Sequence, residues 1–182
     1  HDHYIKQTYR NRCTIAGPDG ELALSIPTVK LDTLKCPMKD IRISDHGNWR
    51  HLHWNAIESA YNNTPFFEYY KDDFRPFYEK KYEFLIDFNE EICRLVCQLI
   101  DIQPNIERTS AYKMEFSAEE TDFRESIHPK KDFRTTDPEF SPQPYYQVFE
   151  SKLGFLPNLS IIDLLFNMGP ESLLVLKKPT RL

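Results

Sequence analysis

Three short polar side chains lie within an otherwise apolar stretch near the C-terminus, and they could carry chemistry. The stretch PNLSIIDLLFNMGPE, residues 157–171, keeps Ser160, Asp163 and Asn167 at spacings of three and four. At 100° per residue on a helix, these three fall within an arc of roughly 60°, and apolar residues cover nearly all the rest. The pattern predicts a helix surrounded by protein, with small polar groups that can be held in place.

Three interpretations of this polar stripe remain open. Ser160 could cap the helix while Asp163 completes a capping box and Asn167 faces solvent. The three residues could instead form a buried network with an arginine or lysine, or they could line a ligand pocket. An unpaired buried polar group costs about 1–3 kcal/mol, so Asp163 needs a cationic or hydrogen-bonding partner in both of these cases.

A second concentration of polar residues lies near the N-terminus, in KQTYRNRC at residues 6–13. If this segment is a strand, alternation puts Lys6, Arg10 and Arg12 on one face and Asn11 on the other. That face is either a solvated sheet surface or a cationic wall for a phosphate or carboxylate. The planar fork of arginine suits such ligands better than lysine does.

The histidine spacing in HGNWRHLHW argues against a metal site. His51 and His53 are two residues apart, so they point away from each other on a helix. His53 shares a predicted helical stripe with Trp49 and could be a packed core imidazole. Near a carboxylate, a buried neutral histidine is also a usable general base. We therefore expect no metal, and the chemistry that these residues suggest is general acid–base catalysis.

The bulk composition narrows the class of protein. The 182 residues predict a single domain over 1–182, and the net charge of −5 argues against a general nucleic-acid binder. No apolar window is long enough to span a bilayer, and no nucleotide-binding motif occurs, so no cofactor is expected. The four cysteines lack metal-ligand spacing and are expected to be reduced thiols of a cytoplasmic protein.

The elements that would position these side chains follow a simple order. Residues 9–29 predict a hairpin around the turn sequence GPDG, residues 39–45 a third strand, and 105–112 a further short strand. Helices are expected over 48–63, 64–74, 87–101, 145–154, 158–168 and 170–178. Thr64 is the expected cap of the second helix, and Pro76 should end or kink it.

Residues 117–144 are rich in proline and charge, and they predict a long irregular loop. Strands followed by helices predict an α+β (mixed α/β) fold. A small N-terminal β-sheet, made of the hairpin plus a third strand, would pack against a larger and mainly helical portion.

Three strings carry a resemblance to a known family. YIKQTYRNRCTI, HLHWNAIESAYNNTPFFEYY and YYQVFESKLGFLPNLSIIDLLFNMGPESL closely resemble the WbqC-like protein family of bacteria. The similarity spans nearly the whole chain and keeps the motifs in order. Family members usually begin with a segment like Q-P-x-Y-x-P, which is absent here, so the resemblance implies that this N-terminal segment is missing.

The resemblance implies a role in O-antigen and other surface-polysaccharide pathways, where members are thought to transfer an aminoacyl group to an amino sugar. Its motif residues map onto Lys6, Asn11, Arg12, His53, Tyr61, Ser160, Asp163 and Asn167. The implied partners are a nucleotide-linked amino sugar and an aminoacyl carrier protein.

Acyl transfer to an amine needs a base for the amine proton and donors for the oxyanion. His53 and Asp163 are the candidate bases, and Asn11, Arg12 and Asn167 are the candidate donors. The cationic residues of the first strand could hold a diphosphate. The leading hypothesis is a cytoplasmic acyl- or aminoacyltransferase, and the alternative is a non-catalytic binding or assembly subunit of such a pathway.

Overall fold

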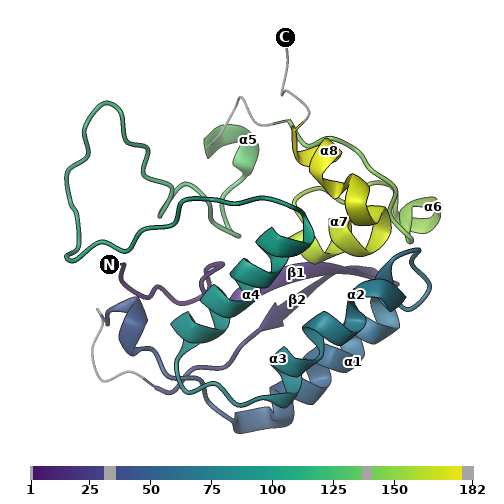
Figure 1. Ribbon diagram of the computed structural model, residues 1–182, viewed down its shortest axis with the longest axis horizontal. Helices are drawn as coiled ribbons and strands as arrows, with labels where there is room; N and C mark the ends of the chain where they lie inside the picture. The colour runs from purple at the N-terminus through teal and green to yellow at the C-terminus, as the bar shows by residue number, and fades with distance from the viewer. Residues whose placement is uncertain (1, 31–35, 137–140, 178–182) are drawn as a thin grey trace.

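The N-terminal hairpin forms at the turn that the sequence predicts. Figure 1 shows the computed structural model, which describes residues 2–30, 36–136 and 141–177. Strands β1 (Arg12–Gly17) and β2 (Gly20–Ser25) pair antiparallel, with Arg12 opposite Ser25 and Gly17 opposite Gly20. Gly20 has a φ of 125°, which the tight turn requires and which other residues rarely adopt. Together with the helices, this two-stranded sheet confirms an α+β fold.

The predicted third strand is wrong. Residues 38–40 form the short 3₁₀ helix η1 (Met38–Asp40), and the segment after it makes only isolated bridges, Thr28 to Ile43 and Arg42 to Phe84. The expected alternation is present, because Ile41 and Ile43 are buried while Arg42 is exposed. The segment does not extend the sheet because its backbone hydrogen bonds go to residues 27–29 and 83–85, not to β1 or β2.

Two other predicted extended segments are also not strands. Residues 6–11 form turns, in which the Thr8 hydroxyl donates to the Ile5 carbonyl at 2.7 Å and Gln7 has a φ of 62°. A short polar side chain that bonds nearby backbone favours a turn over a strand. Residues 105–112 have no regular structure within the part of the chain that the structure describes.

Helices make up most of the regular structure. The longer ones are α1 (Trp49–Tyr61), which follows η2 (His46–Asn48), α2 (Phe67–Phe74), α4 (Leu85–Leu99) and α7 (Ile161–Met168). The shorter ones are α3 (Pro76–Glu79), α5 (Phe133–Thr136), α6 (Glu150–Leu153), η3 (Gly169–Glu171) and α8 (Ser172–Lys177). None of the described helices is long and apolar enough to cross a membrane.

Among the expected helix boundaries, those at Thr64 and over 145–154 differ from the structure, and the break at Pro76 agrees with it. Thr64 does not cap α2, because its hydroxyl and its backbone N–H both donate to the Tyr61 carbonyl and so close α1 instead. The helix expected over 145–154 is reduced to α6, since Gln147 hydrogen-bonds elsewhere. Pro76 separates α2 from α3, as predicted.

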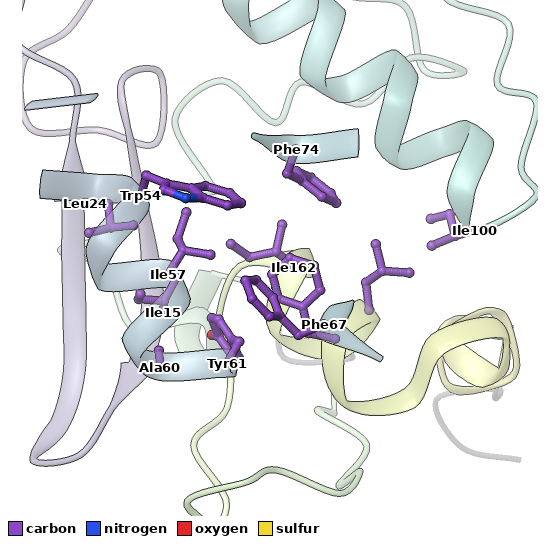
Figure 2. Packing of buried hydrophobic residues seen from close by; sticks show 12 residues of the cluster. Ile15, Leu24, Trp54, Ile57, Ala60, Tyr61, Phe67, Phe74, Ile100 and Ile162 are labelled. Atoms are coloured by element: carbon purple, nitrogen blue, oxygen red, sulfur yellow. The ribbon is translucent and has the colours of Figure 1, made fainter. Parts of the chain in front are cut away.

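The core consists of two apolar clusters. Figure 2 shows the first, where Trp54, Ile57 and Tyr61 of α1 meet the hairpin on one side and the Phe67 and Ile162 region on the other. The second lies around Trp49, Ile41, Phe77, Leu85 and Phe88, beneath the N-terminal half of α4. Helix α4 runs over the hairpin and contributes to both clusters, and α7 lies near its C-terminal end (Figure 1). This arrangement brings β1, α1, α4 and the start of α7 together.

Candidate functional site

A cavity of about 490 Å³ lies where these elements meet. Its walls come from the hairpin, α1, α4, the segment after α4, and the start of α7. Four of the residues selected from the sequence line it: Asn11, Arg12, His53 and Ser160. Its size is typical of a small-molecule site.

Asn11 is held rigidly at the entry to β1 and leaves one polar atom unused. Its Nδ2 donates to the Ile26 carbonyl at 2.8 Å, and its own carbonyl accepts the Ile26 N–H at 2.8 Å. Its Oδ1 is buried and has no hydrogen-bond partner among the described residues. Since buried polar atoms are nearly always paired, this oxygen offers an acceptor to a ligand in the cavity.

Arg12 brings a positive charge to the cavity. Its Nε donates to the Ser25 hydroxyl at 3.1 Å, across the hairpin register. Within the described part of the chain, its guanidinium forms no ion pair with a carboxylate. Two nitrogens of the fork therefore remain for an anionic or carbonyl ligand.

His53 faces the same end of the hairpin. Its ring packs edge-on against Trp49 at 5.2 Å between ring centroids, and a ring nitrogen is hydrogen-bonded to the Ser25 carbonyl. Burial lowers the pKa of His53 to about 4, although the hydrogen bond opposes this change. The imidazole is therefore neutral at pH 7, and its second nitrogen is an acceptor.

Ser160 and Cys13 meet at the start of α7. The Ser160 N–H donates to the Thr14 carbonyl at 2.7 Å, which fixes the helix start against β1. The Ser160 hydroxyl is hydrogen-bonded to the Cys13 thiol, whose pKa burial raises to about 11. Ser160 occupies the N-cap position but its side chain makes no cap bond, so the capping-box interpretation is wrong.

Asp163 lies behind the cavity in a closed hydrogen-bond network. It is fully buried and accepts bonds from the Tyr61 hydroxyl at 2.9 Å, the Tyr145 hydroxyl at 2.7 Å and Gln147 Nε2 at 3.1 Å. Burial raises the pKa of the Asp163 carboxyl, and the three donors only partly offset this. The network interpretation therefore holds for Asp163 and Asn167 but not for Ser160, which lines the cavity, and the partners are neutral donors in place of the expected arginine or lysine.

The same network joins distant parts of the chain. Tyr61 Oη also accepts the Ala16 N–H at 3.2 Å, which links α1 to β1. Asn167 is 2% exposed; its Nδ2 donates to the Asp163 carbonyl and its Oδ1 accepts the Val148 N–H. Tyr61, Asp163 and Asn167 are not among the residues that line the cavity. They hold β1, α1 and α7 in position around it.

The predicted cationic wall does not assemble, because residues 6–11 turn. Lys6 is exposed and does not line the cavity. Arg10 points away, and its Nε is paired with Asp2 at 2.7 Å. Only Arg12, the first residue of β1, remains on the cavity.

The structure adds residues that the sequence did not single out. Cys13, Asn89 and Tyr78 line the cavity, and Tyr145 and Gln147 complete the Asp163 network. Asn89 Nδ2 donates to the Arg10 carbonyl at 2.8 Å. No local sequence signal marks these residues. Among the described residues, no group of three or more His, Cys, Asp or Glu side chains could hold a metal ion.

Comparison of the chain with known proteins shows which class it belongs to. The chain belongs to the WbqC-like protein family, whose model matches residues 1–130. That match includes the hairpin, α1 and α4, and ends before α7. The chain is also similar to the uncharacterized protein Rv1507c of Mycobacterium tuberculosis, with 24% identity over 189 residues that cover 93% of this chain and 81% of that protein. No solved structure matches the chain.

Proposed function

We propose that this protein transfers an acyl or aminoacyl group to the amine of an amino sugar in bacterial surface-polysaccharide biosynthesis. Membership of the WbqC-like family supports the pathway. The observation that carries the chemistry is one cavity lined by a neutral imidazole, a guanidinium without a carboxylate partner among the described residues, and an unpaired amide oxygen. These are the groups that amide formation requires.

The proposed reaction joins the sugar amine to the carbonyl carbon of a carrier-borne thioester. The C–N bond forms, the C–S bond breaks, and the proton lost by the amine ends on the departing thiolate. Asn11 Oδ1 accepts a hydrogen bond from the amine, and His53 takes its proton and passes it on. The Arg12 guanidinium donates to the oxyanion that develops on the carbonyl oxygen.

Asp163 has a positioning role in this proposal. Its two oxygens already accept three hydrogen bonds, so it is occupied and distant from solvent. Asp163 holds β1 in position through Tyr61, and it holds Ser160 in position through the start of α7. We assign the same role to Tyr61 and Asn167.

The direct test supplies the purified protein with UDP-linked amino sugars and a panel of acyl and aminoacyl thioesters, and detects acylated sugar by mass spectrometry. We expect Arg12→Gln and His53→Gln each to reduce the product at least about tenfold, the effect of losing one transition-state interaction. Arg42→Gln is the matched control, because Arg42 pairs with Glu83 on the surface. Equal activity of Arg12→Gln and Arg42→Gln would contradict the proposed site.

One observation favours the second candidate, a non-catalytic binding or assembly subunit. A pKa of about 4 makes His53 a weak proton acceptor near neutrality. A thermal-shift screen separates the two functions, since a ligand that binds the folded state raises the melting temperature. Stabilisation by a nucleotide-linked sugar without product from any thioester would support the binding subunit.

A further inference from the structure

We infer that the cavity receives the aliphatic chain of an acyl donor, with an anionic or carbonyl head at Arg12. This inference rests on the proposed function and narrows its donor class. It follows from three features of the cavity: where its polar groups lie, what forms its remaining walls, and which charges it contains.

Three of the polar residues, Asn11, Arg12 and His53, gather at one end, around the last residues of the hairpin. Arg12 donates to the Ser25 hydroxyl, His53 is bonded to the Ser25 carbonyl, and Asn11 is bonded twice to Ile26. Asn89, near the N-terminal end of α4, is tied to the same region through the Arg10 carbonyl. A ligand head group therefore has one defined polar end to bind.

The remaining walls are largely aliphatic and follow α4. They comprise Ile92 and Val96 of α4, Ile100 and Ile102 beyond it, and Leu24 and Ile162 from the opposite side. Asn89 to Leu99 is ten residues, which is about 15 Å along a helix. Several of these side chains, including Ile92, Val96 and Ile102, are only half-buried. An alkyl chain lying along α4 would cover them and remove apolar surface from water.

The charge of the cavity disfavours an aminoacyl donor. Among the described residues that line it, Arg12 is the only one with a formal charge at pH 7, and none is aspartate or glutamate. The ammonium of a glycyl or other aminoacyl group would lose water without gaining a carboxylate, which is costly. A carboxylate or phosphate head gains a charge-assisted partner in Arg12.

Isothermal titration with simple amphiphiles tests this directly. We expect butanoate, hexanoate, octanoate and decanoate to bind progressively more tightly, by about fourfold for each methylene until the chain fills the cavity. Octylammonium, with the same chain and the opposite charge, should bind at least about tenfold more weakly than octanoate. Affinity that is independent of chain length, or preference for octylammonium, would overturn the inference.

A pair of variants on α4 localises the binding. Val96→Phe places a larger side chain into the cavity and should reduce octanoate affinity at least about tenfold. Gln98→Phe makes the matched change on an exposed position of the same helix that does not line the cavity, and should leave affinity unchanged. Equal effects of the two substitutions would contradict the assignment.

Protection of a cysteine thiol from alkylation gives an independent measurement, and it uses the protein without any substitution. Cys97 lines the cavity, whereas Cys36 is similarly half-buried but lies outside it. Saturating octanoate should slow alkylation of Cys97 several-fold, measured by peptide mass spectrometry, while Cys36 reacts at an unchanged rate. Equal rates at Cys97 with and without octanoate would place the ligand elsewhere.

The tests of ligand binding can succeed or fail independently of the test of acyl transfer. Octanoate binding that meets every expectation, without product from any thioester, would support this inference and contradict acyl transfer. Conversely, if the protein transfers an aminoacyl group and octanoate does not inhibit this reaction, the proposed transferase activity would be supported. The inference that the cavity binds an aliphatic acyl donor would then be contradicted.

Discussion

At the scale of single residues, the half-buried His53 and the fully buried Asp163 compensate for burial to different extents. His53 loses its proton because burial disfavours the imidazolium, and its only described hydrogen-bond partner is a backbone carbonyl. Asp163 is also buried, and three donors partly offset the effect of that burial. The difference matters for function, because the histidine faces a cavity and keeps a free acceptor, whereas the carboxylate has its oxygens engaged.

The lowered pKa of His53 predicts how stability depends on pH. In the unfolded chain His53 has its ordinary pKa of 6.5, whereas in the folded protein its pKa is about 4. Stability is therefore complete above about pH 6.5 and falls as the pH decreases toward 4, by about 1–2 kcal/mol at pH 5 after allowance for partial exposure. Urea unfolding at several pH values measures this. His53→Gln should flatten the slope, and His51→Gln, on an exposed position, should keep it.

The two tyrosines on Asp163 should differ in importance. Tyr61→Phe leaves both an Asp163 oxygen and the Ala16 N–H without their partner, whereas Tyr145→Phe removes one of two donors to the other oxygen. Each buried unsatisfied group costs about 1–3 kcal/mol, so Tyr61→Phe should destabilise by clearly more than Tyr145→Phe. Chemical denaturation of both variants compares them. An equal loss would mean that the link to Ala16 contributes nothing.

At the scale of elements, α7 is the helix on which the site depends. Its start is bonded to β1, its middle to α1 and its end to the segment around Val148. Its C-terminus closes on Gly169, which has a φ of 54° and lies against the Phe66 ring. A glycine is required there both by the backbone conformation and by the space.

Substitutions at two glycines can separate these causes. A Cβ at Gly169 would lie 2.4 Å from the Phe66 ring, whereas a Cβ at Gly154, which has a φ of 73°, would meet nothing within 4 Å. Gly154→Ala should cost about 1–3 kcal/mol from backbone strain alone, and Gly169→Ala should cost more because of the added clash. Thermal unfolding measures both. Equal costs would show that Phe66 moves aside freely.

At the scale of the whole molecule, the core and the segment after α4 differ in character. The two clusters share Tyr78, Ile92 and Leu95, so they are expected to unfold together. Residues 103–132 instead extend from the body in a long irregular arm, visible at the left of Figure 1. Several of its apolar side chains are exposed, including Met114 at 82%.

Hydrogen exchange should separate these two regions. Amides of residues 103–132 are expected to exchange at least about a hundredfold faster than those of α1 and α4, because few backbone hydrogen bonds are described for them. Mass spectrometry of proteolytic fragments measures the rates. Strong protection in the arm would mean that it packs on a partner in solution.

The sequence by itself determined the elements whose signals are local. The hairpin turn, most helices, the break at Pro76 and the irregular stretch over residues 117–132 all follow from short-range preferences of the chain, whereas α5 forms within the loop expected over 117–144. It also selected His53, Arg12 and Asn11, which line the cavity, and it singled out Asp163 as a buried polar group that needs partners. Resemblance to the WbqC-like family was confirmed by the match over residues 1–130.

Only the tertiary structure decided which of these groups share a site. The partners of Asp163 lie 102, 18 and 16 residues away in the chain, so no local pattern could reveal them. Lys6 and Arg10 do not line the cavity, because the Thr8 hydroxyl donates to the Ile5 carbonyl and the chain turns there instead of forming a strand. The cavity itself exists because α4 crosses the hairpin, and such long-range packing depends on how whole faces fit together.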